Sequence, residues 1–281
     1  WAMYTDTLPA SATDLRGAAW SGSAATGSQH EEPFIFDDAP FKEAEIDAQL
    51  QRLAREAAVG TKAERRRLLK LLRKSHKQGL FTTAEHRVGT VKGYQHTIRR
   101  STDAPTFQRQ YPTPPHRTRE MARQAEQMLA EGIVHPTTSP FNCPTLLVSK
   151  GPGKAPRFCA DLRAFHETVI PDYFEVPNVR TVVADLAQWN IFSSMDVSQG
   201  FHCVELSKTD GVNGGIPSAH QLAFTLADGR RFAYARMPFG LKDGSSVFSK
   251  LLASAIRSEQ RCSRQFVDDV FSIANEVPPA L

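Results

Sequence analysis

The sequence has few cysteines and no long hydrophobic run. Its four cysteines form no Cys-x-x-Cys pair and lie at no zinc-site spacing from a histidine: Cys143, Cys159, Cys203 and Cys262. No apolar segment approaches the roughly 20 residues of a membrane-spanning helix, and the first residues lack the charged-then-apolar order of a signal peptide. We therefore expect no membrane span, and reduced thiols packed mostly in the core of an intracellular protein. The sequence does not distinguish cytoplasm, nucleus and organelle.

Positive charge is concentrated in one stretch of the chain. Residues 62–77 hold eight Lys or Arg and one acid, a net charge of +7, whereas the whole chain carries only +4. Leucines at helical spacing accompany them, so this stretch reads as an amphipathic helix. Its cations either neutralise the phosphates of RNA or DNA or form a solvated face over a leucine core. The candidate nucleic-acid contacts in it are Arg65, Arg66, Arg67, Lys70, Arg73 and Lys74.

Composition and periodicity divide the chain into three parts. Residues 1–40, rich in Ala, Ser, Thr and Gly, predict a flexible or extended tail. Residues 41–80 predict a helical extension of two helices, at 41–58 and 62–78, each followed by a glycine. Residues 81–281 alternate strands and helices. We expect helices at 118–131, 179–188 and 245–257. We also expect two hairpins, one of 145–149 with 156–160 and one of 221–226 with 231–235. This order predicts an α+β fold with helices packed on an antiparallel sheet.

Two adjacent carboxylates, Asp268 and Asp269, interrupt an apolar stretch that reads as strand, turn, strand. Neighbouring residues in a strand face opposite sides, so the pair can point the same way only within the turn itself. Acidic pairs are common in exposed turns, and the doublet alone does not exclude that reading. Asp196, which ends the predicted strand 190–195, supplies a third carboxylate. Three carboxylates from two elements suit a pair of Mg²⁺ ions in a phosphoryl-transfer site.

An ordered series of motifs gives these carboxylates a context. Residues 94–275 resemble the fingers and palm of reverse transcriptases, most of all those of Ty3/gypsy-type retrotransposons. The motifs are, in order, His96-Thr97-Ile98, Asp103-Ala104-Pro105, Gln108-Arg109, Gly132-Ile133-Val134, Thr138-Ser139-Pro140, Arg157-Phe158-Cys159-Ala160-Asp161-Leu162-Arg163, Ile170-Pro171-Asp172, Met195-Asp196 with Gly200-Phe201-His202, Met237-Pro238-Phe239-Gly240-Leu241 and Phe266-Val267-Asp268-Asp269. The palm core is expected at about 190–205 and 230–277.

The resemblance implies a role for each candidate residue. Asp196, Asp268 and Asp269 are the implied catalytic carboxylates, and together with Val197 they would hold two Mg²⁺ (or Mn²⁺) ions. Phe201 is implied to select deoxynucleotides, although it also fits a plain core aromatic. The other implied nucleotide-binding residues are Lys150, Lys154, Arg157, Phe239 and Gly240. Arg163 is expected to form a structural ion pair with Asp161 or to contact the template.

Four departures from the family pattern stand against these roles. Residues 261–265, before the aspartates, are polar, and Lys242-Asp243-Gly244 replaces the usual Asn-Ala-Pro. Ser249 stands where a glutamine is expected, and residues 210–220 look like an insertion. The given chain also ends twelve residues after Asp269, before a thumb or ribonuclease H domain would begin.

Two functions therefore stay open. One is an RNA-directed DNA polymerase acting on an RNA/DNA template-primer and dNTPs. The other is a captured, catalytically inactive relic that binds nucleic acid, such as ribosomal RNA, or serves as a structural subunit of a larger ribonucleoprotein complex.

Overall fold

The computed structural model describes residues 2–4, 42–57, 60–83, 88–149, 151, 155–175, 178–209, 216–259 and 261–275. The chain divides into two compact units. We call residues 1–85, 177–197 and 255–281 the carboxylate unit, and residues 86–176 and 198–254 the aromatic unit. Most of the predicted tail, residues 5–40, lies outside the described residues.

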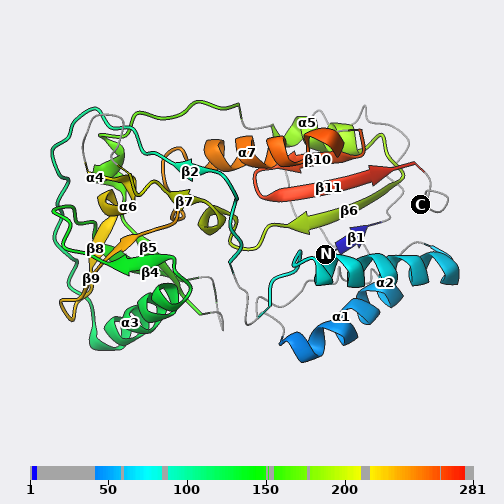
Figure 1. Cartoon of the computed structure of the whole chain (residues 1–281), viewed down its shortest axis with the longest axis horizontal. Coiled ribbons are helices and arrows are strands. Elements are labelled where there is room, and N and C mark those ends of the chain that lie inside the picture. The colour runs from blue at the N-terminus through cyan, green and yellow to red at the C-terminus, as the bar shows by residue number, and fades with distance from the viewer. Residues whose placement is uncertain are drawn as a thin grey trace, which may run out of the picture. The chain divides into compact units, whose positions relative to one another are not determined.

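The carboxylate unit contains a four-stranded antiparallel sheet. Its strands run in the order β1 (Ala2–Tyr4), β6 (Ile191–Asp196), β11 (Asp269–Ala274) and β10 (Ser263–Phe266), and Figure 1 shows the last three side by side. Val270 and Ile273 of the central strand β11 are buried. The two strands that end or begin with the predicted catalytic aspartates are therefore direct neighbours.

The polar strand β10 keeps its place in this sheet. All four of its residues pair with β11, from Ser263 opposite Ser272 to Phe266 opposite Asp269. Helix α5 (Val179–Leu186) packs against β10, and Arg264 Nε donates a hydrogen bond to the carboxylate of Asp185 in that helix. Arg264, one of the polar residues that depart from the family pattern, thus has a partner in α5.

The helical extension is a hairpin of α1 (Glu43–Glu56) and α2 (Lys62–Lys77), close to the predicted 41–58 and 62–78. Thr61 caps α2. Its hydroxyl accepts the Glu64 N–H while the Glu64 carboxylate accepts the Thr61 N–H, so two otherwise unpaired donors are satisfied. The apolar stripes of the two helices form a core of their own, built from Ile46, Leu50, Ala54 and Leu72.

The aromatic unit combines small sheets with helices. A three-stranded sheet has the order β3 (Val134–Pro136), β9 (Arg231–Tyr234), β8 (Ala223–Thr225). The predicted hairpin forms from β4 (Thr145–Val148) and β5 (Arg157–Ala160), and β2 (Gln95–His96) runs parallel to β7 (Glu205–Leu206). The helical elements of this unit are α3 (Pro115–Ala130), α4 (Arg163–His166), the short η1 (Gly200–Cys203), α6 (Ser218–Gln221) and α7 (Gly244–Ala255), which reaches the unit boundary.

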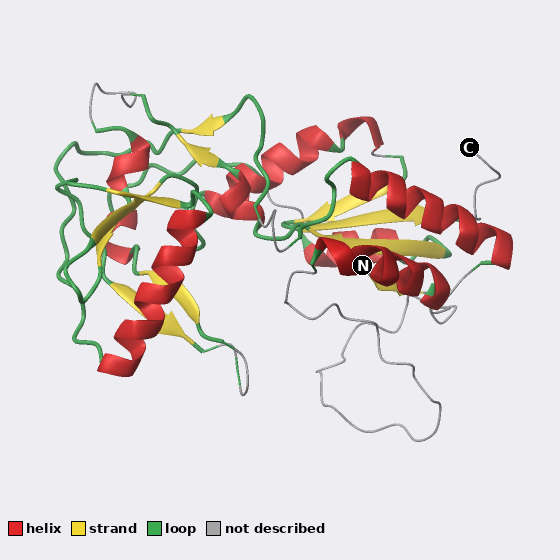
Figure 2. Ribbon diagram, turned by 60° about the horizontal axis from the view of Figure 1, so that its bottom comes forward, coloured by secondary structure: helices red, strands yellow, loops and turns green. Residues whose placement is uncertain are grey.

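Figure 2 shows this mixture of helices and strands, and the predicted α+β class is confirmed. Helix α3 begins three residues earlier than the predicted 118–131. Pro115 occupies its first turn, where a missing N–H is no loss, so the proline-rich segment starts the helix rather than delaying it.

Two of the opening expectations can be compared with the described residues. None of their helices is long and apolar enough to cross a bilayer. The cysteines form no disulfide among themselves, but only Cys143 is buried; Cys159 and Cys203 are half-buried and Cys262 is exposed. The expectation that most of them pack in the core is therefore wrong, because three of the four lie at or near the surface.

Candidate active site

The register of β6 against β11 brings the candidate carboxylates together. Asp269 pairs directly with Asp196 across the two strands, and Asp268 lies in the turn that precedes β11. Side chains that face each other on neighbouring antiparallel strands have Cβ atoms about 5 Å apart. The Val197 N–H donates a hydrogen bond to the Asp268 carbonyl oxygen at 3.1 Å, which joins the end of β6 to the turn.

The turn itself differs from the expected one. Its two central residues are Val267 and Asp268, and Asp269 is already the first residue of the strand. The expectation that both aspartates sit in the turn is therefore wrong for Asp269. Val267 has a φ of 53°, a left-handed conformation that is unfavourable for a β-branched residue. Such a backbone stores on the order of 1–3 kcal/mol and persists only where the surrounding strands impose it.

Electrostatics at this end of the sheet favour a bound cation. Partial burial raises the pKa of Asp269, and the nearby charges of Asp268 and Asp196 raise it further. A carboxyl group whose ionisation is disfavoured by other carboxylates gains from a divalent metal, for which carboxylate oxygens are suitable ligands. Among the described residues, no three His, Cys, Asp or Glu side chains already converge as a metal site. Metal binding would therefore require these carboxyl groups to turn toward one another. With that adjustment, the donor set fits Mg²⁺.

Three predicted nucleotide-binding residues meet in the aromatic unit. The Phe201 and Phe239 rings lie 5.3 Å apart in an edge-to-face arrangement, and the Arg157 guanidinium lies 5.4 Å from the centre of the Phe239 ring. Phe201 also packs on Phe248 at 5.7 Å, but it remains half-buried. It is thus both a packed aromatic and an accessible one. Lys150 and Lys154 lie outside the described residues.

Glycines allow this aromatic cluster to pack closely. A Cβ atom on Gly200 would lie 2.7 Å from Phe248, and one on Gly244 would lie 3.2 Å from Phe201. Gly244 is the last residue of the departure at 242–244, so this departure makes room for the Phe201 ring. Gly240 has a φ of +82°, which explains a glycine at that position.

His202 is a neighbour of the cluster to which the sequence analysis gave no role. Its ring lies 4.8 Å from Phe239, and its Nδ1 is 3.1 Å from the Met237 carbonyl oxygen. Burial lowers the pKa of His202 to about 4. The Met237 carbonyl opposes this shift, and Arg236 adds a smaller lowering. His202 is therefore neutral at pH 7 and supports Phe239 as a packed ring. Its place beside Phe201 in the sequence was the available signal.

Arg163 forms the structural ion pair that was expected. Its guanidinium donates to both oxygens of Asp161, at 2.9 and 2.6 Å, and the Tyr111 hydroxyl donates to the same carboxylate. These bonds hold the pKa of Asp161 well below its usual range, with Arg163 as the largest cause. The Arg163 side chain is still 85% exposed, so a template contact remains compatible with the ion pair.

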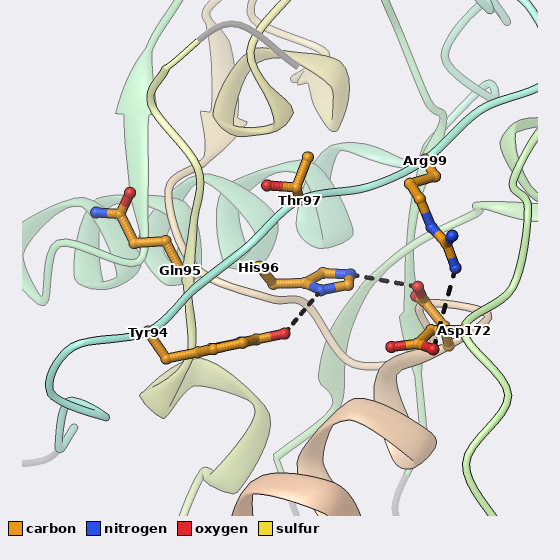
Figure 3. A pocket seen from close by; sticks show the side chains of 7 residues that line it. Tyr94, Gln95, His96, Thr97, Arg99 and Asp172 are labelled. Atoms are coloured by element: carbon orange, nitrogen blue, oxygen red, sulfur yellow. Dashed lines mark hydrogen bonds and ion pairs between the residues drawn. The ribbon is translucent and has the colours of Figure 1, made fainter. Parts of the chain in front are cut away.

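A polar pocket was not foreseen from the sequence. It measures about 340 Å³ and is lined by Tyr94, Gln95, His96, Thr97, Arg99, Asp172 and Asp243 (Figure 3). Asp243, the middle residue of the departure at 242–244, is only 3% exposed, and its Oδ2 lies 3.3 Å from Nε2 of the equally buried His96. The two atoms lie within ion-pair distance, but the contact lacks hydrogen-bond geometry. Asp243, which follows the motif 237–241, therefore contacts His96 of the motif His96-Thr97-Ile98.

Known proteins are similar to this chain in sequence. The Pol polyproteins of the transposons opus and gypsy from Drosophila melanogaster are 28% and 30% identical to the chain over 184 and 182 residues. These segments cover 64% and 62% of the chain but only 17% and 16% of the polyproteins, so the chain spans about a sixth of their length. No family model matches.

The solved structures decide the fold. A foamy viral protease-reverse transcriptase in complex with an RNA/DNA hybrid superposes with a TM-score of 0.72 at 23% identity, over 88% of this chain and 31% of that one. The chain has the fold of a reverse transcriptase. It is related to the Pol polyproteins of gypsy-type retrotransposons, as the motifs implied. Within this reverse transcriptase fold, Asp196 and Asp269 are paired across neighbouring strands, and the Phe201, Phe239 and Arg157 cluster forms in the aromatic unit.

Proposed function

We propose that this chain is the reverse transcriptase segment of a retrotransposon Pol polyprotein and adds deoxynucleotides to a primer 3′-hydroxyl on an RNA or DNA template. The observation that carries the proposal is the β6–β11 register, which pairs Asp196 with Asp269 and sets Asp268 in the adjoining turn. The related polyproteins and the reverse transcriptase fold support it. The inactive relic is not favoured, because all three carboxylates are present at one end of one sheet.

The carboxylates have a clear task in such a reaction. Asp196, Asp268 and Asp269, with the main chain at Val197, would hold two Mg²⁺ or Mn²⁺ ions. Bound there, the ions would lower the pKa of the primer hydroxyl and neutralise charge on the departing pyrophosphate. The raised pKa of Asp269 supports this assignment, since the site has more negative charge than its own surroundings stabilise.

The aromatic cluster would orient the nucleotide. Arg157 has a planar guanidinium suited to phosphate oxygens, and its position over Phe239 restricts the side chain before a ligand arrives. The half-buried Phe201 ring would lie against the sugar and exclude a 2′-hydroxyl. Gly240, whose space on the Cβ side is open, would let the backbone approach nucleic acid closely.

A primer-extension assay tests the catalytic assignment. The chain is mixed with a labelled DNA primer on an RNA template, one dNTP, and Mg²⁺ or Mn²⁺. We expect Asp268→Asn to abolish addition while template-primer binding stays within about twofold, because a neutral amide keeps the shape but not the charge of the carboxylate. Asp228→Asn, in the turn between β8 and β9, is the matched control and should extend normally.

The outcomes separate the two functions. Unchanged extension by Asp268→Asn would rule out the carboxylate assignment. Binding of template-primer without extension by either the parent chain or Asp228→Asn would instead favour the relic. Phe201→Ala provides an independent check, since removal of the ring should lower the preference for dNTPs over rNTPs by roughly tenfold or more.

A further inference from the structure

The α1–α2 hairpin has a charged face for which the polymerase reaction gives no role. Helix α1 contains four acids and two arginines, a net charge of −2, whereas α2 contains eight Lys or Arg and one Glu, a net charge of +7. The two helices pack through their apolar sides, where Leu72 is buried and Leu68 and Leu69 are half-buried. The charge of α2 therefore faces outward.

Two of the α2 cations serve the hairpin itself. Arg65 Nη1 donates to the Arg55 carbonyl oxygen at 2.9 Å, near the end of α1. Arg73 donates two hydrogen bonds to the Asp47 carboxylate, at 2.6 and 2.9 Å. Arg73 is the reason that the pKa of Asp47 falls to about 2. Although both arginines were candidate nucleic-acid contacts, they are engaged in joining the two helices.

Apart from Lys62 in the first turn, the remaining cations form what we call the basic stripe: Arg66, Arg67, Lys70, Lys74 and Lys77. All five are exposed, and within the described part of the chain none of them forms a hydrogen bond or ion pair. At about 100° per residue, Arg67, Lys70 and Lys74 lie opposite the buried leucines. From Arg66 to Lys77 the stripe extends about 16 Å along the helix. Five unpaired cations on one rigid face form a surface suited to a polyanion.

The packing of the hairpin selects the kind of polyanion. A helix that lies on a lipid surface needs a broad apolar face to insert below the headgroups. The apolar face of α2 is already occupied by α1, and Leu71, at 58% exposure, is the single large apolar side chain that the helix leaves outside. A membrane surface would therefore gain little beyond charge. The phosphate backbone of a nucleic acid needs only the charge, at the spacing that a rigid helix provides.

We propose that the basic stripe binds the phosphate backbone of RNA or DNA without regard to sequence, as a surface separate from the carboxylates and the aromatic cluster. Its cations contact phosphates, and the Arg73–Asp47 and Arg65–Arg55 bonds keep the helix in position. The proposal does not depend on polymerase activity, because Asp268→Asn leaves the stripe intact.

Fluorescence anisotropy of the chain with labelled, mixed-sequence single-stranded RNA and duplex DNA tests this surface. The test variant is Arg67→Ala/Lys70→Ala/Lys74→Ala. A matched control, Lys42→Ala/Arg52→Ala/Arg55→Ala, removes two cations from the neighbouring helix and one from the residue before it, and keeps the Arg55 carbonyl. Binding is measured between about 50 and 200 mM salt, and circular dichroism checks that both variants keep their helix content.

For the test variant, we expect the slope of log association constant against log salt concentration to become shallower by about 2–3. The variant should also bind roughly 10- to 100-fold more weakly at low salt. The control should stay within about threefold of the parent. Affinity of the test variant within twofold of the parent, or an equal loss in the control, would overturn the proposal. So would unchanged nucleic-acid binding combined with lost binding to vesicles rich in phosphatidylserine, since that result would assign the stripe to a membrane surface.

Discussion

Replacing Asp269 by asparagine should stabilise the protein in the absence of divalent metal. In the folded chain Asp269 is partly buried and faces Asp196 across the sheet, with Asp268 beside it, and its pKa is raised for these reasons. At neutral pH its ionised form is therefore repelled by its neighbours, a penalty that the unfolded chain does not have. Asparagine keeps the size of the side chain and removes the charge.

The geometry bounds the size of this effect. Two unit charges about 5 Å apart interact by roughly 1 kcal/mol in water and by roughly 3 kcal/mol at the effective dielectric of a protein surface. Asp196 is exposed and Asp269 only half-buried, so the value lies toward the lower bound. A gain of about 1 kcal/mol corresponds to a rise in Tm of roughly 2–4 °C for a domain of this size.

The pH dependence has a definite sign. Because the folded pKa of Asp269 is raised, the group stabilises the fold fully below its unfolded pKa, and that contribution is lost as pH rises through the folded pKa. The advantage of Asp269→Asn is thus complete near pH 7 and shrinks as the wild-type carboxyl becomes protonated. Asp228 provides the opposite case. Arg230 lowers its pKa, so Asp228→Asn should reduce Tm at pH 7.

Thermal unfolding with EDTA, at several pH values, measures both variants. Added Mg²⁺ should then raise the free energy of unfolding of the parent by about 1.4 kcal/mol at a free concentration tenfold above Kd, with a corresponding rise in Tm. It should stabilise Asp269→Asn less. A lower Tm for Asp269→Asn in EDTA at pH 7 would refute the reasoning. Such a result would mean that Asp269 has a partner that stabilises its charge in the metal-free protein.

Further predictions concern the aromatic unit. Asp243→Ala should lower the free energy of unfolding by about 1–3 kcal/mol, because it leaves buried His96 without its neighbour. Asp243→Asn should lower it by less than about 1 kcal/mol. Equal losses for the two variants in urea unfolding would count against a role for this pair. Gly200→Ala should lower it by about 1–3 kcal/mol, because the new methyl meets Phe248, and fluorescence-detected unfolding would detect the loss. Gly240→Ala meets no atom, so we expect only the backbone penalty of about 1 kcal/mol, and a larger loss would indicate a contact not anticipated here.

Much of the local structure was readable from the sequence. Helix α2 appears at 62–77 because leucine spacing, the Thr61 cap and the glycine at 79 all act within a few residues of each other. The hairpin of β4 and β5 and that of β8 and β9 follow from apolar runs on either side of glycine-containing turns. These features depend on near neighbours, whose identities the sequence states directly.

The predictions that failed depend on position to within one residue. Placing both aspartates in the turn was wrong, since β11 begins at Asp269. In a strand a shift of one residue exchanges the two faces, so pairing with β6, rather than local preference, decides the side on which Asp269 lies. The polar residues of β10 counted against the predicted roles, because the sequence does not reveal that the Asp185 carboxylate accepts a hydrogen bond from Arg264.

By itself, the sequence determined the motifs, the helices and hairpins, the concentration of charge in residues 62–77, and the resemblance that led to the reverse transcriptase fold. Tertiary structure alone decided that Asp269 faces Asp196, that Arg157 lies over Phe239, and that Asp243 meets His96. It also decided which cations of α2 hold the hairpin and which face outward. The reason is physical: helix and turn preferences act over a few residues, whereas charges and rings interact through space, and only the folded chain sets those distances.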